Sequence, residues 1–392
     1  MIKVLHVITG LERGGAEMML HKLLGRLPRD LVSNEVVSLT GEGSVAAWIR
    51  ELGVPVYALG ARRGVPDPRA VTRLIRRLRT SRPQIVQTWM YHADLIGGLA
   101  AKLAGPIPVV WNIRQSKLDP VHSKRLTIWT AKICARLSHR IPTRIVCCSE
   151  AAARIHREMG YAGDKLVIIP NGFDVEGFKP DSGARISVQA ELGIGQNHPV
   201  IGLVARFDPQ KDHRTFVDAA SILGARLPLA RFVLCGDGVT WENQELARWI
   251  DDAGIRDRVY LLGRRDDIAR LLNAFDVATL SSAYGEGFPN VVGEAMACGV
   301  PCVVTDVGDS AWIVGDTGRV VPIRDPKALA DSWLALVEAG HQARQALGAR
   351  ARARIVEQFD LDAIAGRYAK LYCELAQDIT DVDARVDRRT WP

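Results

Sequence analysis

Short, nearly continuous apolar runs alternate with amphipathic segments along most of the chain. Residues 3–9, 85–88 and 277–280 are runs of the first kind, and residues 16–27 and 95–103 are segments of the second. A continuous apolar run indicates a strand buried on both faces, whereas apolar residues at helical spacing indicate a helix with one buried side. The alternation therefore predicts parallel β-sheets that are covered by helices on both faces.

One polar, glycine-containing stretch without strong periodicity, residues 176–198, interrupts this pattern. The chain has 392 residues, which is enough for two domains of ordinary size. We therefore expect two doubly wound α/β domains, at residues 1–175 and 199–357, with residues 176–198 as the linker. Residues 358–378 should form a helix, and residues 379–392 a frayed tail.

Ligands of such sheets bind beyond the carboxyl ends of the strands, so polar residues that follow strands are candidate site residues. In the first half these include His92, Asn112 and Arg114. The first strand leads into a loop in which Gly14 and Gly15 precede a helix. This arrangement suits a phosphate, although a tight turn without a ligand has the same pattern, and the loop lacks the G-x-G-x-x-G spacing of dinucleotide-binding folds.

In the second half, two cations follow the strand predicted at residues 199–205. Arg206 and Lys211 lie five positions apart, just past the end of this strand. An arginine supplies a fork of donors and a lysine supplies a point charge, so the two side chains can reach one diphosphate.

The stretch at residues 284–301, YGEGFPNVVGEAMACGVP, contains two carboxylates separated by seven residues. Glycines and a proline break regular structure around Glu286, which places this residue on a loop. Asn290 is expected to cap a helix over residues 291–297, and Glu294 then lies in the first turns of that helix.

The start of this helix offers unpaired N–H groups and a partial positive charge, which favour an anion. A carboxylate on either side of an anion site fits a ligand with phosphates in its middle and hydroxyls at both ends, such as a nucleotide sugar. A capped helix with two incidental glutamates is the alternative, but the glycines and the flanking apolar strands favour the ligand site. The donor-binding candidates here are Gly287, Phe288, Pro289, Asn290, Val291 and Glu294.

The spacing from Glu286 to Glu294 resembles the E-x7-E motif of retaining glycosyltransferases with the GT-B fold, close to glycosyltransferase family 4. Other landmarks of that family occur in the same order, so the resemblance covers most of the chain. It implies two Rossmann-like domains that face a cleft, with the donor on the second domain and the acceptor on the first. It also implies that the last helix, for which residues 361–375 are the candidate, returns to the first domain.

The resemblance further implies a role for each candidate. Glu286 would face the donor sugar and Glu294 would bind the ribose, while Arg206 and Lys211 would stabilise the leaving nucleoside diphosphate. Gly14 and Gly15 would let the backbone approach the donor phosphate, and His92 would lie near the sugar and the acceptor. The turn that contains Arg264 would border the nucleobase, and Asn112 and Arg114 are candidate acceptor contacts.

Charge is distributed unevenly between the two halves. Residues 1–175 contain 26 Lys and Arg against 13 Asp and Glu, whereas the rest of the chain contains 25 against 31. Within the basic half, a helical segment carries Lys124, Arg125, Lys132 and Arg136 among apolar residues that include Trp129. Such a segment is typical of helices that lie on an anionic membrane surface, although a solvated face above a core-facing stripe has the same pattern. No nucleic-acid-binding signature accompanies the charge, so nucleic acid is not an expected partner.

The seven cysteines are scattered and no CxxC pair occurs, which indicates reduced core thiols rather than a zinc site. The cysteine pattern indicates a cytoplasmic protein, and the resemblance implies a retaining glycosyltransferase that works at the inner membrane face and needs neither a cofactor nor a metal. Its substrates would be a nucleotide sugar and a lipid-linked saccharide used in cell-surface polysaccharide or lipopolysaccharide assembly. A nucleotide-sugar epimerase or phosphorylase of similar fold, or a non-catalytic sugar- or nucleic-acid-binding scaffold, are the alternatives.

Overall fold

The structure is a computed structural model that describes residues 1–62, 67–114 and 125–387. The chain forms two compact units, one comprising Met1–Gly172 with Leu361–Pro392 and the other Phe173–Asp360. The chain therefore passes from one unit to the other at residues 172–173 and 360–361, where the sequence predicted 175 and 358.

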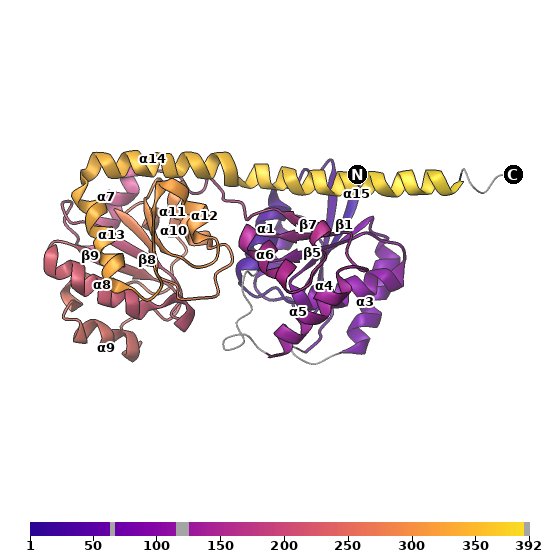
Figure 1. Cartoon of the computed structure of the whole chain (residues 1–392), viewed down its shortest axis with the longest axis horizontal. Coiled ribbons are helices and arrows are strands. Elements are labelled where there is room, and N and C mark those ends of the chain that lie inside the picture. Colours follow the sequence, from indigo (N-terminus) through magenta and orange to yellow (C-terminus); the bar gives the residue numbers. More distant parts are fainter. Residues whose placement is uncertain (63–66, 115–124, 388–392) are drawn as a thin grey trace. The chain divides into compact units, whose positions relative to one another are not determined.

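The first unit is built on a seven-stranded sheet with the strand order β3-β2-β1-β4-β5-β6-β7, in which every strand pairs in parallel (Figure 1). The order reverses direction between β1 and β4, which makes this position a topological switch point, where ligands of such sheets bind. The strands are β1 (Ile2–Ile8), β2 (Val32–Ser38), β3 (Val56–Ala58), β4 (Ile85–Trp89), β5 (Val109–Ile113), β6 (Arg144–Cys147) and β7 (Leu166–Ile168).

Helices cover both faces of this sheet. The helices α1, α2 and α15 share one apolar core with strands β1, β2, β4 and β5, whereas α3, α4 and α5 pack side by side. The helices are α1 (Gly15–Arg26), α2 (Val45–Glu51), α3 (Pro68–Ser81), α4 (Tyr91–Ala104), α5 (Arg125–Leu137), α6 (Glu150–Glu158), the 3₁₀ turn η1 (Gly163–Lys165) and α15 (Leu361–Asp387).

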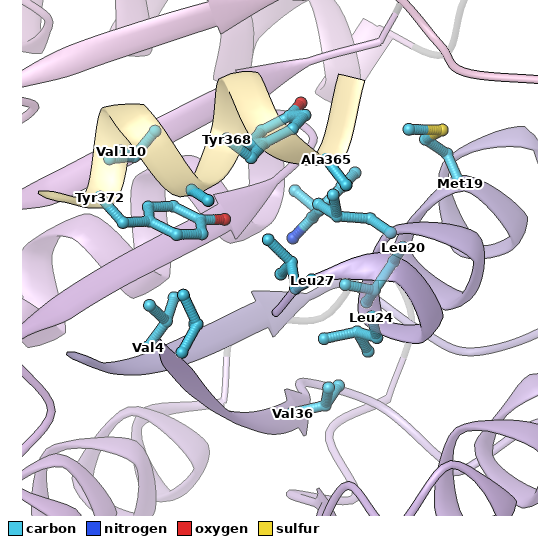
Figure 2. Close-up of a cluster of buried hydrophobic side chains, with 14 of the residues drawn as sticks. Val4, Met19, Leu20, Leu24, Leu27, Val36, Val110, Ala365, Tyr368 and Tyr372 are labelled. Atoms are coloured by element: carbon cyan, nitrogen blue, oxygen red, sulfur yellow. The ribbon is translucent and has the colours of Figure 1, made fainter. Parts of the chain in front are cut away.

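The last helix, α15, packs on the first unit, as the resemblance implied. Its apolar residues recur at helical spacing, so one side of the helix enters the core beside α1. Figure 2 shows Ala365, Tyr368 and Tyr372 on the side of this helix that faces the strands, with Ala365 near Leu20 and Tyr372 above Val4. The helix continues to Asp387, because residues 378–387 contain no glycine or proline that would end it. The prediction of a frayed tail from residue 379 is therefore wrong for residues 379–387.

The second unit contains a parallel six-stranded sheet with the order β10-β9-β8-β11-β12-β13. Its strands are β8 (Val200–Val204), β9 (Arg231–Cys235), β10 (Val259–Leu261), β11 (Val277–Leu280), β12 (Cys302–Thr305) and β13 (Arg319–Val321). Its helices are α7 (Ser182–Leu192), α8 (His213–Arg226), α9 (Gln244–Asp252), α10 (Ile268–Leu272), α11 (Asn290–Ala297), α12 (Ser310–Val314), α13 (Pro326–Glu338), α14 (Gly340–Phe359) and the 3₁₀ turns η2 (Pro209–Lys211), η3 (Arg256–Arg258) and η4 (Gly315–Thr317). The prediction of two doubly wound α/β domains is confirmed.

The segment predicted to be a linker, residues 176–198, folds in part as helix α7. Asp181 caps this helix by accepting hydrogen bonds from the N–H groups of Gly183 and Ala184. Ala184 and Val188 are buried, so the helix belongs to the second unit. The apolar residues of this helix stand at every second position, Ala184, Ile186, Val188, Ala190 and Leu192, so the sequence shows no helical periodicity.

Within the described parts of the chain, none of the helices combines the length and the apolar character needed to cross a membrane.

Candidate functional site

The loops that follow successive strands of the second unit are tied to one another by main-chain hydrogen bonds. After β8, the N–H of Phe207 donates to the carbonyl of Asp237, which follows β9, over 2.7 Å. After β11, the N–H of Ala283 donates to the carbonyl of Gln210 over 2.9 Å. The neighbouring strands β8 and β11 therefore present the predicted Arg206–Lys211 and Glu286 loops at one edge of the sheet.

Two glycines make this packing possible. Gly285 has a φ of +75°, a conformation that residues with a side chain rarely adopt. Gly308, after β12, has a φ of +61°, and a Cβ at this position would lie 2.4 Å from the main-chain oxygen of Glu286. The loop that carries Glu286 is therefore held against the loop after β12, and the main-chain N–H of Asp309 donates to the carbonyl of Gly287 over 3.0 Å.

Glu286 and Lys211 form a largely buried ion pair. The ammonium group of Lys211 contacts Oε1 of Glu286, and the hydroxyl of Ser282 donates to the same oxygen over 2.7 Å. The exposed fraction of the side chain is 8% for Glu286 and 16% for Lys211, so each charge has lost most of its contact with water. Such a pair is held by hydrogen bonds and by the mutual attraction of its charges, which offset the cost of desolvation.

Arg206 lies on the same loop as Lys211 but points into solvent. The exposed fraction of its side chain is 56%, and its Nε lies 3.2 Å from Oδ2 of Asp208. The other oxygen of Asp208 accepts a hydrogen bond from the main chain of Gln210 over 2.9 Å, which shapes the loop between the two cations. The structure therefore brings Lys211 to Glu286 and leaves Arg206 at the surface, and their joint contact with a diphosphate stays a prediction.

Helix α11 begins one residue earlier than the sequence predicted. Pro289 occupies the N-cap position and Asn290 is the first helical residue, so the prediction that Asn290 caps the helix is wrong. Pro289 has no side-chain acceptor, and the helix start carries no side-chain cap. Uncapped N–H groups at a helix start are the kind that bind an anion. Glu294 lies in the second turn of this helix, and Val291 follows Asn290 in the first.

Phe288 is buried in an aromatic cluster beneath the loop. Its ring lies 5.8 Å from that of Phe173, 5.6 Å from that of Phe359 and 5.9 Å from that of Trp312, measured between ring centroids. Only 6% of Phe288 is exposed. Its side chain therefore anchors the loop, and a contribution of Phe288 to donor binding would come from its main chain.

The turn after β10 contains two arginines with different environments. The side chain of Arg264 is 55% exposed and lies 4.0 Å from Asp266, whereas Arg265 binds both Glu191 and Asp267. The guanidinium of Arg265, together with that of Arg270, holds the pKa of Asp267 well below its usual range. Arg265 therefore supports the turn, and Arg264 is the residue that remains available for the predicted contact with a nucleobase.

In the first unit, the predicted residues also lie at the carboxyl ends of strands. Gly14 is the N-cap of α1, and a Cβ at this position would lie 2.5 Å from the Glu17 carboxylate. A Cβ at Gly15 would meet no atom within 4 Å, so the backbone there faces open space. His92 is the second residue of α4 and is partly buried, and this burial lowers the pKa of its imidazole.

The segment before His92 is fixed by the buried carboxyl group of Asp94. The hydroxyl of Thr88 donates to Oδ1 of Asp94 over 2.5 Å, and burial raises the pKa of Asp94 well above its usual range. Met90 has a φ of +72° and its N–H donates to the carbonyl of Asn112 over 3.0 Å. The turn between β4 and α4 is thus a strained but well-anchored conformation, as is common near functional sites.

Asn112 and Arg114 both contact α15. Asn112 is fully buried and its Nδ2 donates to the hydroxyl of Tyr368 over 3.2 Å. Arg114 donates to the same hydroxyl over 2.6 Å and to Oδ1 of Asn171 over 2.7 Å, with its guanidinium 5.0 Å from the centre of the Trp89 ring. Both side chains tie the last helix to the sheet, and their predicted contact with an acceptor remains a prediction.

The sequence did not single out the hydroxyl groups around Glu286. Ser281 donates to the main-chain oxygen of Lys211 over 2.8 Å, and Thr305 donates to the main-chain oxygen of Ser282 over 2.7 Å. The only signal in the sequence is that two serines stand directly after a strand and before a glycine loop. Among the described residues, no three His, Cys, Asp or Glu side chains gather in a way that could hold a metal ion.

Both halves of the chain match known glycosyltransferase families. The family described as "Glycosyltransferase Family 4" matches residues 13–176, and the one described as "Glycosyl transferases group 1" matches residues 198–339.

Curated relatives agree with these matches. EpsF of Bacillus subtilis (strain 168), which carries a glycosyltransferase name, is 31% identical over 318 residues, covering 78% of this chain and 79% of EpsF. The UDP-Gal:alpha-D-GlcNAc-diphosphoundecaprenol alpha-1,3-galactosyltransferase of Escherichia coli is 25% identical, with coverage of 79% and 80%. The N,N'-diacetylbacillosaminyl-diphospho-undecaprenol alpha-1,3-N-acetylgalactosaminyltransferase of Campylobacter jejuni is 26% identical, with coverage of 88% and 93%.

Solved structures confirm the fold. Anabaena Alr3699/HepE in complex with UDP has a TM-score of 0.84 at 23% identity, covering 95% of this chain and 100% of that chain. Sucrose-phosphate synthase (tll1590) from Thermosynechococcus elongatus has a TM-score of 0.77 at 19% identity, with coverage of 96% and 99%.

The matches favour glycosyl transfer over the epimerase, phosphorylase and scaffold alternatives. The chain belongs to glycosyltransferase family 4 and has the GT-B fold.

Proposed function

We propose that this glycosyltransferase moves a sugar from a nucleoside-diphosphate sugar to a hydroxyl of a lipid-linked saccharide, with retention at the anomeric carbon. The observation that carries the donor part of this proposal is the Lys211–Glu286–Ser282 group beside the uncapped start of α11. A cation, a carboxylate and the positive end of a helix are the three features that a diphosphate attached to a sugar requires.

In the proposed donor complex, Lys211, Arg206 and the start of α11 bind the diphosphate and stabilise its charge as it leaves. An ammonium group has three donors, so Lys211 can keep its contact with Glu286 and still reach a phosphate oxygen. Glu286 accepts hydrogen bonds from sugar hydroxyls and faces the positive charge that develops at the anomeric carbon. Glu294 binds the ribose. The leaving phosphate takes the acceptor proton, so neither glutamate acts as a nucleophile, and no metal ion takes part.

The acceptor is proposed from two relatives. The names of the E. coli and C. jejuni enzymes both specify a saccharide linked through diphosphate to undecaprenol. A protein that binds such an acceptor works where the lipid is embedded in the membrane. The second part of the proposal is therefore that this protein contacts an anionic membrane at the inner membrane face.

Helix α5 exposes apolar side chains to solvent. Leu126 is 49% exposed, Trp129 66% and Ile133 41%. The side chains of α5 that enter the core are other ones, namely Thr130, Ala131, Cys134 and Ala135. The alternative in which the apolar residues of α5 form a core-facing stripe therefore does not account for Leu126, Trp129 and Ile133. An exposed tryptophan flanked by aliphatic side chains on a basic helix favours a membrane interface.

The neighbouring helix α4, which packs beside α5 (Figure 1), extends this surface. Its Leu99 and Leu103 are 41% and 60% exposed. Basic residues stand among them, including Arg125, Lys132, Arg136, Arg140 and Lys102, all exposed. Lys124, part of the predicted basic set, lies outside the described residues. We call Leu99, Leu103, Leu126, Trp129, Ile133 and these basic residues the α4–α5 surface.

Contact of the α4–α5 surface with an anionic membrane predicts membrane binding that weakens as the salt concentration rises. The protein should sediment with anionic liposomes at low salt and be released as salt rises, because each basic residue near the surface contributes about 1 kcal/mol. Replacing Lys124, Arg125, Lys132 and Arg136 by glutamine should abolish co-sedimentation. A control that replaces four exposed basic residues of the second unit, Arg256, Arg319, Arg324 and Lys327, should still bind. Equal sedimentation with anionic and neutral liposomes would contradict the proposal.

The donor part is tested by binding and by transfer. Thermal unfolding should be measured with UDP, GDP, ADP and dTDP, since a nucleotide at 100 times its dissociation constant stabilises a protein by about 2.7 kcal/mol. The corresponding nucleotide sugars should then be assayed for transfer to an undecaprenyl-diphosphate saccharide, and the product analysed for its anomeric configuration. Absence of stabilisation by all four nucleotides, or an inverted product, would overturn the proposal.

Replacement of Arg206 tests diphosphate binding without a change in the fold. Since the side chain of Arg206 is exposed, its replacement by alanine should not affect stability. It should weaken binding of the preferred nucleoside diphosphate, at a cost of roughly 1.5–3 kcal/mol for a charge-assisted contact. Isothermal calorimetry measures this loss. Arg264→Ala is the matched control at the proposed nucleobase edge, and its effect on nucleotide affinity should differ between nucleotides with different bases. Wild-type affinity in Arg206→Ala would exclude Arg206 from the site.

A further inference from the structure

Two consecutive serines follow β11, and each donates a hydrogen bond to a different partner of the Lys211–Glu286 ion pair. The hydroxyl of Ser282 donates to Oε1 of Glu286 over 2.7 Å. The hydroxyl of Ser281 donates to the main-chain oxygen of Lys211 over 2.8 Å. Both serines are fully buried. Neither hydroxyl can therefore turn to water, and each is committed to its partner.

The bond from Ser282 holds Oε1 of Glu286 more rigidly than the contact from Lys211 does. A lysine reaches its partner through a flexible four-carbon chain, whereas a serine hydroxyl is one bond from Cβ. The main chain of Ser282 is itself held, because its carbonyl accepts the hydroxyl hydrogen of Thr305 on the neighbouring strand β12 over 2.7 Å. The main chain of Glu286 is also held, against the loop after β12, so the hydroxyl of Ser282 adds the orientation of the Glu286 side chain.

The greater rigidity of the contact from Ser282 matters when a donor is bound. A diphosphate beside Lys211 shares the ammonium group with Glu286, so Lys211 orients the carboxylate less strictly when the donor is bound. The hydroxyl of Ser282 keeps its bond to Glu286, because this side chain is fully buried. A catalytic group that is displaced by even 1 Å loses much of its effect on the rate.

We propose that Ser282 is a positioning residue that holds the Glu286 carboxylate toward the donor sugar, and that Ser281 is a positioning residue that holds Lys211 for the diphosphate. This assignment rests on the proposed function. It divides two adjacent serines between two steps: Ser281 supports binding of the nucleotide, and Ser282 supports the chemical step.

The same substitution at the two positions should therefore have different kinetic results. Ser282→Ala should lower kcat roughly ten- to hundredfold, the range expected for a misplaced catalytic group, while its dissociation constant for the nucleoside diphosphate stays within about twofold of wild type. Ser281→Ala should raise that dissociation constant several-fold and leave kcat at saturating donor near the wild-type value. Ser282→Cys, which keeps the size and a weak donor, should have an intermediate kcat and serves as the second variant if Ser282→Ala does not fold.

A double-mutant comparison separates positioning from general damage to the loop. In a Glu286→Ala background the carboxylate that Ser282 holds is gone, so adding Ser282→Ala should cause no further loss of kcat. An equal loss in both backgrounds, or a wild-type kcat in Ser282→Ala, would overturn the positioning role alone. Absence of transfer by the wild-type protein with every donor would instead overturn the proposed function, and the positioning role with it.

Discussion

Glu286→Gln should keep the fold and bind nucleoside diphosphate like the wild type, but lose most sugar transfer; it should lose some stability as well, because Lys211 loses its counter-charge. Glutamine has nearly the same shape as glutamate, and its amide oxygen can still accept the hydrogen bond from Ser282 that glutamate accepts over 2.7 Å. It carries no charge, however, so it stabilises the positive charge that develops at the anomeric carbon far less. Removal of one such electrostatic contact typically costs about 10²–10³ in rate.

Glu294→Gln is the matched variant, since it makes the same chemical change in the second turn of α11. This variant should weaken binding of the whole nucleotide through its ribose and affect turnover at saturating donor much less. Calorimetric affinities for the free nucleotide, measured beside kcat for both variants, decide between the roles. If Glu286→Gln loses nucleotide affinity while Glu294→Gln loses only turnover, the two roles are assigned in reverse. If neither variant changes, residues 284–301 form only a loop and a helix without catalytic function.

Lys211→Ala should affect stability as well as nucleotide binding, which distinguishes it from Arg206→Ala. It leaves the Glu286 side chain, 8% exposed, without the cation that compensates its charge. Loss of one partner of a buried pair costs about 3–5 kcal/mol, and the lower end is expected here, because the Lys211 side chain is 16% exposed. Denaturant unfolding measures this loss.

Two controls test the cause of that instability. Lys211→Met combined with Glu286→Gln removes both charges and should recover most of the lost stability, because no uncompensated charge remains in the core. Arg226→Ala breaks a surface pair with Asp331, in which the side chains are 50% and 38% exposed, and should cost about 1 kcal/mol or less. A Lys211→Ala protein as stable as Arg226→Ala would contradict a buried, mutually dependent pair.

The errors in the sequence-based prediction have local causes. Asn290 is a favoured N-cap residue, but Pro289 immediately precedes it and already has an extended conformation, so the helix begins at Asn290 itself. Phe288 is not among these errors: its ring packs against Phe173, Phe359 and Trp312, so the prediction that Phe288 binds the donor now concerns its main chain. The composition of residues 176–198 concealed α7, a helix with only three buried residues.

The sequence by itself determined the two parallel-sheet domains and the family to which the chain belongs, and the resemblance to that family implied the return of the last helix to the first domain. These properties depend on periodicity and on short motifs, which are local and can be read without knowing what lies across the sheet. Only the tertiary structure decided which side chains meet. Lys211 reaches Glu286 across 75 positions because β8 lies next to β11 in the sheet, a strand order that follows from packing of the whole unit and from no local pattern. For the same reason, the exposure of Trp129 and the burial of Asn112 against Tyr368 were set by neighbours from other parts of the chain.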